Sequence, residues 1–474
     1  MVIHPLDNVE IRDDGHKYAR RLIKAGEDVI KYGMPIGHAV CDIPEGEHVH
    51  VHNIKTNLGD VLEYRYDEEE AKKAIHLFAE REAVIPTIKA YRHLDGRIGI
   101  RNDIWVIPTV GCVNNVAEKL AKEFDGVALT HPYGCSQLGD DHEMTAEMLA
   151  SLARHPNAGG VLVVALGCEN NTLESFVKRL GFDSSTFNSE EGTFKLEGGG
   201  ETLLNIRFLK AQDALDEIEK GRVLIQKLLE DRPQAREDVP VSELVVGLKC
   251  GGSDGFSGLT ANPLVGRFSD WLVRRGGSTV LTEVPEMFGA ETLLMKRCRT
   301  REVFEKCVRM INDFKAYYTR HNQVIYENPS PGNKAGGIST LEDKSLGCVQ
   351  KGGSSPVEDV LNYGESVKKK GLTLLTGPGN DLVASTVLAA AGCHIILFTT
   401  GRGTPFGTVV PTMKISTNTK LSEAKNRWID WCAMTDGDVE HFAEKVMSVA
   451  SGEKACNELN GDRSIAIFKD GVTL

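Results

Sequence analysis

The sequence predicts an α/β protein, in which a small N-terminal β module is followed by two layered α/β domains with largely parallel sheets. Two patterns carry this prediction. Residues 1–60 are rich in glycine, proline and β-branched residues, and part of this segment alternates with a period of two, which is typical of short β-strands. From residue 100 onward, apolar runs of strand length alternate with stretches of helix length, an order that implies right-handed parallel crossovers.

The chain divides into four predicted parts. Residues 1–60 form the β module, and residues 61–99 form a linker or arm with a short helix within 67–82, where acidic residues precede spaced apolar ones. Residues 100–232 form the first α/β domain and residues 240–474 the second. A polar stretch with two prolines separates these two domains.

The α/β domains are expected from their alternating segments. In the first domain, the predicted strands are 103–110, 126–130 and 159–167, and the predicted helices are 114–124, 141–155 and 172–181. In the second α/β domain, residues 240–474, the apolar segments lie at 243–252, 269–277, 278–285, 372–381, 383–393 and 394–403. The glycine-dense segment 328–348 is expected to be a long irregular loop, which in a compact domain is usually functional or mobile.

Composition narrows the class of protein. The chain has 474 residues, 41% of them hydrophobic and 26% charged, as is usual for a folded soluble protein. The formal charge of -12 argues against binding to nucleic acid, which needs clustered Lys and Arg. The chain shows neither a signal peptide nor eighteen consecutive apolar residues, so a cytoplasmic protein without a membrane partner is expected. The eleven cysteines lack the spacing of a disulfide scaffold, and reduced thiols are expected.

Four apolar runs break into polar loops that carry a cysteine, at Cys112, Cys135, Cys168 and Cys250. Polar groups that follow the carboxyl ends of buried strands are where α/β sheets build active sites. The thiols themselves have two interpretations. They are small buried residues, which is the commonest fate of cysteine, or they ligate iron or a cluster, although no CxxC pair occurs.

The segment HVHVH at 48–52 places three imidazoles on one face of a predicted strand. Two neighbouring imidazoles, His50 and His52, are the candidate ligands of a first-row divalent metal, and His16 in the same module is a further ligand or an acid. The alternative is a polar strand face in water.

Two loops of the first α/β domain carry acids and amides directly before a predicted helix. Asp140 and Asp141 could cap that helix while His142 faces the cleft, but two acids and an imidazole exceed what capping needs. Glu169 and Asn170 occupy the same position in the next loop, as caps or as partners of substrate hydroxyls.

Two glycine-rich loops of the second α/β domain are candidate binding loops. The segment KCGGSDGFSG allows close backbone approach to a ligand and exposes Ser253 and Asp254. Arg402 lies between two glycines and could bind a carboxylate, although a role in a turn alone is equally compatible. Neither a GxGxxG fingerprint nor a Walker motif occurs, so no nucleotide cofactor is expected.

Long motifs spread over the whole chain resemble the UxaA family of sugar-acid dehydratases. They run from IHPLDNV at residue 3 to the terminal KDGVTL and include YGCSQLGDDH, VVALGCENN, CGGSDGFSGLTANPLVGRFSD and TLEDKSLGC. The resemblance implies an SAF-type N-terminal module and a hydro-lyase that converts D-altronate to 2-dehydro-3-deoxy-D-gluconate in hexuronate breakdown. It also implies a divalent metal, Fe²⁺ before Mn²⁺. One departure is a segment before Gly15 that is about twenty residues shorter than in the family.

For this reaction we expect a metal at His50 and His52, and an acid and a base among His16, Lys31, Tyr32, Asp141 and His142. Asp140, Glu169, Asn170, Ser253 and Asp254 are expected to bind or orient the sugar acid, and Arg101 and Arg402 to bind its carboxylate. The arrangement requires the β module to fold over the loops that contain Cys135 and His142, from the same chain or from a second subunit of a homo-oligomer, most simply a dimer. Galactarate or sulfolactate is the alternative substrate, and a sugar-acid-binding regulatory protein is the alternative without catalysis.

Overall fold

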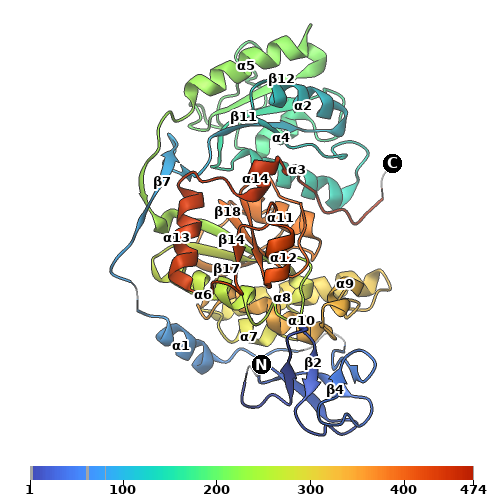
Figure 1. Cartoon of the computed structure of the whole chain (residues 1–474). Helices are drawn as coiled ribbons and strands as arrows, with labels where there is room; N and C mark the ends of the chain where they lie inside the picture. Colours follow the sequence, from blue (N-terminus) through green and yellow to red (C-terminus); the bar gives the residue numbers. More distant parts are fainter. Residues whose placement is uncertain (1–3, 60–62, 81, 473–474) are drawn as a thin grey trace.

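The computed structural model describes residues 4–59, 63–80 and 82–472. Three bodies follow one another along the long axis of the molecule (Figure 1). The N-terminal module, residues 4–59, lies at one end, and the second domain, residues 100–232, lies at the other end. The C-terminal domain, residues 241–472, lies between them, so the chain passes it once before returning to build it.

The N-terminal module is all β, as predicted. Two three-stranded antiparallel sheets, in the orders β1-β2-β5 and β3-β4-β6, enclose a small core that includes Val29, Ile36 and Val49. The strands are β1 Val9–Ile11, β2 Lys17–Ala19, β3 Asp28–Lys31, β4 Met34–Ala39, β5 His48–Val49 and β6 Ile54–Lys55. The segment before Gly15 is short, and each of the two sheets has three strands.

Two connecting segments form a sheet of their own. Helix α1, Glu68–Leu77, lies in the predicted arm and is capped by Asp67, whose carboxylate accepts from the amides of Glu69 and Glu70. The chain then forms β7, Thr87–Arg92, which pairs with β8, Ile98–Gly99, and with β13, Glu237–Pro240. The predicted linker between the α/β domains is therefore partly a strand, paired with the arm that precedes the second domain.

The second domain is a four-stranded parallel sheet of order β10-β9-β11-β12. Helices α2 and α5 cover one face, and α3 and α4 cover the other. The elements are β9 Asp103–Pro108, α2 Asn114–Glu123, β10 Val127–Ala128, α3 Gly139–Ala153, β11 Ala158–Ala165, α4 Leu173–Arg179, β12 Ile206–Lys210 and α5 Glu217–Asp231.

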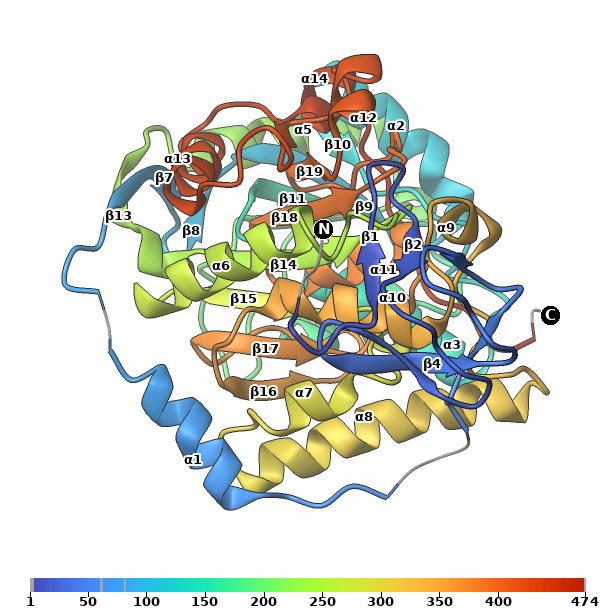
Figure 2. The same cartoon turned by 60° about the horizontal axis from the view of Figure 1, so that its bottom comes forward.

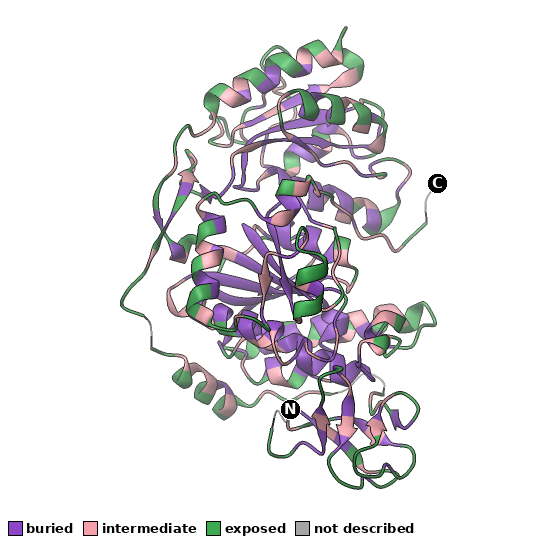
Figure 3. Ribbon diagram, in the orientation of Figure 1, coloured by how far each residue is buried: buried purple, intermediate pink, exposed green. Residues whose placement is uncertain are grey.

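The C-terminal domain is built on a seven-stranded parallel sheet of order β16-β17-β15-β14-β18-β19-β20. Its strands are β14 Val245–Cys250, β15 Ser278–Leu281, β16 Val357–Leu361, β17 Gly371–Leu375, β18 Ile395–Thr400, β19 Thr412–Ser416 and β20 Trp431–Cys432. Its helices are α6 Ala261–Arg274, α7 Glu291–Met295, α8 Arg301–Arg320, α9 Pro331–Ala335, α10 Leu341–Cys348, α11 Asp381–Ala390, α12 Thr419–Ala424, α13 Val439–Ala450 and α14 Cys456–Asn460. The central strands β14 and β18 are buried along nearly their whole length, as expected for a sheet covered on both faces (Figure 3).

The segment 328–348 is not one irregular loop. Ser330 caps α9 and Thr340 caps α10 through their hydroxyl groups, so two short helices replace most of the loop. Every residue of α10 is buried, because the N-terminal module packs against it through β4. Figure 2 shows the strands of that module lying over α10.

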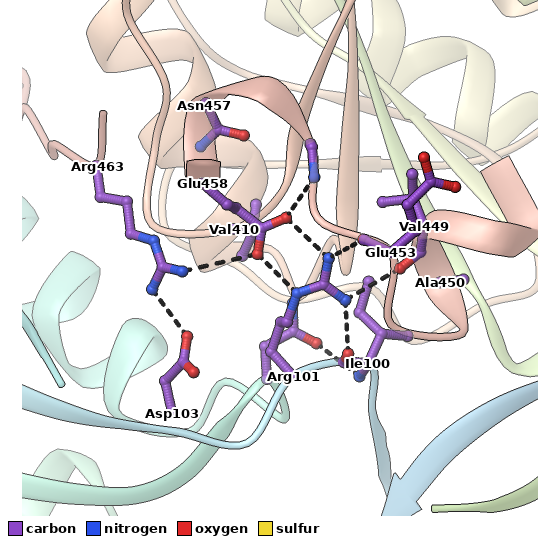
Figure 4. Close-up of polar contacts among 12 residues, drawn as sticks. Ile100, Arg101, Asp103, Val410, Val449, Ala450, Glu453, Asn457, Glu458 and Arg463 are labelled. Carbon is purple, nitrogen blue, oxygen red and sulfur yellow. Dashed lines mark hydrogen bonds and ion pairs between the residues drawn. The ribbon is translucent and has the colours of Figure 1, made fainter. Parts of the chain in front are cut away.

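The second domain and the C-terminal domain are locked together. Arg101 donates two hydrogen bonds to Glu458, at 2.6 and 2.8 Å, and also donates to the carbonyl groups of Val449 and Glu453 (Figure 4). Apolar residues of α3 and α11 share one hydrophobic cluster across the same interface. Among the described residues, no helix is long and apolar enough to cross a membrane.

Candidate active site

A cavity lies between the N-terminal module and the C-terminal domain, and we call it the interdomain cavity. The module contributes Lys31 and Tyr32, from the end of β3 and the turn after it. The C-terminal domain contributes the remaining lining residues, which are Ser253, Asp254, Ser257, Gly258, Asn262, Ile338, Asp343, Lys344, Gly347 and Cys348. The cavity therefore lies at the carboxyl ends of the central strands, where open parallel sheets place their sites.

Tyr32 is held in an unusual conformation at this cavity. Its φ of 60° is in the left-handed region, which costs a tyrosine energy and needs support from surrounding packing. A Cβ on Gly258 would lie 2.2 Å from the Tyr32 Oη, so only glycine leaves room for the hydroxyl group there. Burial raises the pKa of Tyr32, and the phenol is therefore protonated at neutral pH.

Three charges at the edge of the cavity form one buried group. Asp343 accepts from Lys17 Nζ at 2.7 Å and from Lys31 Nζ at 2.9 Å, and all three side chains are at most 2% exposed. Lys17 also donates to the carbonyl oxygen of Gly337 at 2.5 Å. One carboxylate thus faces two ammonium groups, which leaves one positive charge without a compensating partner inside the group.

The two lysines respond differently to this imbalance. Burial lowers the pKa of Lys17 to about 8, and the charge of Lys31 adds to the effect. Burial also opposes the charged form of Lys31, but Asp343 and Tyr32 outweigh it and raise the pKa of Lys31 above its ordinary value. Near neutral pH, Lys31 therefore stays positively charged, whereas Lys17 loses its proton when the pH rises to about 8.

A second buried group adjoins the cavity through Cys348. The Sγ atoms of Cys250 and Cys348 are 3.3 Å apart, and both thiols donate to Oε2 of Glu286, at 3.0 and 3.1 Å. Lys344 lies 2.7 Å from the other oxygen of Glu286. Burial raises the pKa of Glu286, but Lys344 and Lys351 outweigh it and lower that pKa to about 2.

Cys250, Glu286 and Cys348 form a donor set that is compatible with a divalent metal. Among the described residues, they are the only three metal-ligating side chains whose ligand atoms all lie within 4.8 Å of one another. A hydrogen bond from Cys250, together with burial, raises the pKa of Cys348 far above its ordinary value, so a metal would have to displace a thiol proton. Two thiolates and a carboxylate suit Fe²⁺ better than Mn²⁺, which prefers oxygen ligands.

The histidines of the N-terminal module gather beside the same interface. His16 Nδ1 lies 3.0 Å from His48 Nε2, and His50 Nδ1 lies 3.1 Å from Oγ of Ser339, which is next to Ile338 of the cavity. Burial and the charge of Lys17 lower the pKa of His50 to about 4, which keeps this imidazole neutral. His52 is exposed, and its ring lies 5.7 Å from that of His48.

The predicted strand 48–52 is a strand only at His48–Val49, and residues 50–53 form a turn, so the three imidazoles do not share a strand face. Within one chain the histidine segment does not reach the loop that holds Cys135 and His142, because His50 contacts the segment after α9 whereas His142 lies in the first turn of α3, in the second domain (Figure 1). Asp141 accepts from the amides of Asp470 and Gly471, at 2.8 and 2.7 Å, and so holds the C-terminal tail. An arrangement of one site from both segments would need a second copy of the chain.

The remaining predicted residues have well-defined surroundings. Glu169 accepts from Thr109 and from two amides of its own loop, whereas Asn170 accepts from the amide of Ser136. Asp140 is exposed at the start of α3. These residues order the loops of the second domain, far from the interdomain cavity.

The predicted carboxylate-binding arginines differ in availability. The guanidinium of Arg101 is committed to Glu458 at the domain interface, as described above. Arg402 is exposed, and within the part of the chain that the structure describes its guanidinium has no ion pair. A Cβ on Gly332 of α9 would lie 3.7 Å from Nε of Arg402, which places this guanidinium beside α9.

Sequence reasoning missed Lys17, Glu286, Asp343, Lys344 and Cys348. Their surroundings come from contacts between distant parts of the chain, since Lys17 and Asp343 are 326 residues apart in the sequence. In the sequence alone, single lysines and acids in amphipathic stretches look like a solvent-exposed face. The one available signal was the density of charge in TLEDKSLGC, a segment whose residues are nonetheless buried.

Comparison with known proteins decides the family. The model described as the Altronate/galactarate dehydratase SAF domain matches residues 3–57, and the model described as the D-galactarate dehydratase/Altronate hydrolase second domain matches residues 90–232. The D-galactarate/Altronate dehydratase C-terminal model matches residues 241–473. The chain belongs to the galactarate and altronate dehydratase family.

Relatives in this dehydratase family are similar over nearly their whole length. The altronate dehydratase of Bacillus subtilis (strain 168) is 53% identical over 98% of this chain and 94% of its own, and that of Escherichia coli (strain K12) is 50% identical over the same shares. The galactarate dehydratase (L-threo-forming) of Escherichia coli (strain K12) is 33% identical over 95% of this chain and 88% of its own. Altronate dehydratases are hydro-lyases, and at this identity over almost the whole chain the present protein is a hydro-lyase as well.

Proposed function

We propose that the protein is an altronate dehydratase, which eliminates water from D-altronate to give 2-dehydro-3-deoxy-D-gluconate. The observation that carries the proposal is the gap in identity between the relatives named for altronate, at 53% and 50%, and the relative named for galactarate, at 33%. The interdomain cavity supports it, because Lys31 and Lys344 in its lining offer positive charge to a sugar acid although the whole chain carries a charge of -12.

The reaction makes two demands on the site. A base must remove the proton on C2, which is weakly acidic beside a carboxylate, and an acid must protonate the C3 hydroxyl group as it leaves. The negative charge that develops on the carboxylate must be stabilised as well. The enol that forms then becomes the ketone, and the reaction consumes no redox equivalent or nucleotide.

Residues that line the interdomain cavity, together with Lys17, which is bonded to the lining residue Asp343, meet these demands. Lys31 is the fixed cation that binds the substrate carboxylate, because its pKa lies above the ordinary value. Tyr32 remains protonated and points its hydroxyl group at Gly258, so it is the acid for the departing oxygen. Lys17, with a pKa of about 8, is the group that accepts the C2 proton, with Asp343 orienting it and Lys31.

The metal proposed for this site is Fe²⁺, held by Cys250, Glu286 and Cys348. When bound, it supplies a Lewis acid that stabilises negative charge on the substrate carboxylate. His50 and His52 remain a second candidate pair of ligands, at the edge of the same interface. Because Cys348 lines the cavity, a substrate in the cavity could reach the metal held by Cys250, Glu286 and Cys348.

The test is production of a 2-keto-3-deoxy acid by purified protein, assayed anaerobically with Fe²⁺ on D-altronate, galactarate and sulfolactate. The highest kcat/KM is expected with D-altronate, and a higher value with galactarate would replace the proposal by the alternative substrate. Binding of D-altronate without any keto acid would favour the regulatory sugar-acid-binding protein.

The metal ligands are tested by binding, in addition to activity. The double variant Cys250→Ser/Cys348→Ser is expected to lose tight Co²⁺ binding and the thiolate-to-cobalt absorption of the wild type. The variant His50→Gln/His52→Gln serves as the matched comparison. If only the histidine variant loses the signal, the metal lies at the histidines.

A further inference from the structure

Three exposed cysteines lie together at one edge of the second domain. Cys112 follows β9, Cys135 follows β10 and Cys168 follows β11, and these three strands are neighbours in the parallel sheet. Parallel strands end at the same edge, so the loops that follow them meet. Exposure of all three thiols departs from the usual burial of free cysteine and from the expectation of small core residues.

Hydrogen bonds join the three loops within one to three residues of each thiol. The Gly111 amide donates to the Tyr133 carbonyl at 2.8 Å, which joins the loops of Cys112 and Cys135. The Asn171 amide donates to the Gly134 carbonyl at 2.9 Å, and Nδ2 of Asn171 donates to the Thr109 carbonyl at 3.1 Å. The loop of Cys168 is thereby tied to both of the others.

The surroundings of the thiols favour ligation. Nε2 of Gln212 donates to Sγ of Cys168 at 3.6 Å, and Oγ of Ser136 donates to Sγ of Cys135 at 3.8 Å. Cys112 lies in the 3-10 turn Gly111–Val113 that leads into α2, near the positive end of the helix dipole. Hydrogen bonds to sulfur are among the interactions by which proteins tune iron–sulfur clusters.

Buried polar atoms without a partner lie among the same loops. Gln137 is 3% exposed, and its Oε1 accepts from the Gly134 amide, but its Nε2 has no partner among the described residues. Asn171 is fully buried, and its Oδ1 is likewise without a partner there. A donor and an acceptor without a protein partner are thus available to a bound group beside the three thiols.

We infer that Cys112, Cys135 and Cys168 bind an iron–sulfur cluster. These three thiols are not among the metal-ligating groups of the described chain whose ligand atoms all lie within 4.8 Å of one another. A single ion would need that closeness, whereas a cluster of four irons holds its cysteine ligands farther apart. Three thiolates would supply three of the four cysteine ligands that such a cluster usually has.

The inference is independent of the proposed function, because its test needs no substrate. The full-length protein is treated anaerobically with iron and sulfide and then desalted. We expect a broad visible absorption band that requires both reagents, equal amounts of bound iron and acid-labile sulfide, and an electron paramagnetic resonance signal after reduction by dithionite. Each of Cys112→Ser, Cys135→Ser and Cys168→Ser should lower the bound sulfide at least severalfold.

Matched variants separate this site from others. Cys41→Ser removes an exposed thiol of the N-terminal module and should leave the cluster unchanged, as should Cys250→Ser/Cys348→Ser. The inference is overturned if no sulfide-dependent band forms, if the triple variant keeps the band, or if the band is lost only with Cys250 and Cys348. A disulfide between two of the three thiols in the anaerobically purified protein would overturn it as well.

Discussion

Lys17 is the residue whose state depends most on its surroundings. It is fully buried between the N-terminal module and the C-terminal domain, and it shares Asp343 with Lys31. A buried lysine with a lowered pKa is a recurrent form of catalytic base, because it is uncharged close to neutral pH. The same burial is costly to the fold while the lysine is charged.

The first prediction concerns pH. In wild-type protein kcat/KM for D-altronate should rise as pH increases through about 8, since only neutral Lys17 accepts a proton. The pKa of Lys17 is lower in the folded protein than in the unfolded chain, so the unfolded chain binds more protons from about pH 8 up to the ordinary lysine pKa. The free energy of unfolding should therefore also rise with pH across that window. Both are measured as pH profiles, of turnover and of urea unfolding.

Lys17→Arg is the variant that checks this assignment, because arginine keeps its charge at every accessible pH. The pH-dependent rise in turnover should disappear in a variant that circular dichroism shows to be folded. An unchanged pH profile would assign the base elsewhere.

At this scale the sequence could predict residues that stand out by their type and position in a motif. Ser253 and Asp254 were predicted from a glycine-rich strand end, and Lys31 and Tyr32 from the family resemblance; the structure places all four in the lining of the interdomain cavity. Asp343 could not be found in that way. Its role comes from contacts with Lys17 and Lys31, more than 300 residues earlier in the chain.

At the scale of elements, the site depends on how closely α10 and the loop before α6 approach the turn after β3. Gly258 and Gly347 of α10 lie next to each other beside the Tyr32 hydroxyl group, because a Cβ on either would lie 2.2 or 3.6 Å from it. The elements themselves were largely predictable, because strand and helix periods are local. Helix α10 was not predicted, since glycine and charge dominate its segment and its helical state depends on burial beneath the N-terminal module.

The second prediction tests this packing. Gly258→Ala places a methyl group 2.2 Å from the Tyr32 Oη, so the ring must move, and kcat should fall by about tenfold or more, as small misplacements of reacting groups do. Gly437→Ala is the matched control, because its new Cβ makes only an ordinary contact, at 3.5 Å from the Ala433 carbonyl. Equal kcat values for the two variants would show that the Tyr32 position is not critical.

At the scale of the whole molecule, two parallel sheets are joined by one buried ion pair and a shared apolar cluster. Arg101 and Glu458 are each 8% exposed, and the pair closes the interface between the second domain and the C-terminal domain. The order of domains was predictable from composition and alternation. Their stacking was not, since the partner of Arg101 lies 357 residues away.

The third prediction follows from this interface. Arg101→Gln leaves buried Glu458 with only the Ala455 amide and the partly exposed Arg463, 3.7 Å away, as partners. Breaking a buried ion pair in this way typically costs about 3–5 kcal/mol of unfolding free energy. The loss should appear in chemical denaturation, whereas KM for D-altronate of the folded variant should stay near that of wild type. A large rise in KM without loss of stability would instead support the carboxylate-binding role expected from the sequence.

The central claim is that elimination takes place in the interdomain cavity, with Tyr32 as the acid. The most direct measurement compares kcat for D-altronate in Tyr32→Phe and in Tyr18→Phe, a tyrosine of the same module whose hydroxyl group donates to exposed Asp14. We predict that Tyr32→Phe lowers kcat by about 10²- to 10⁴-fold with little change in KM, and that Tyr18→Phe is close to wild type. Near-normal turnover by a folded Tyr32→Phe variant would contradict the claim.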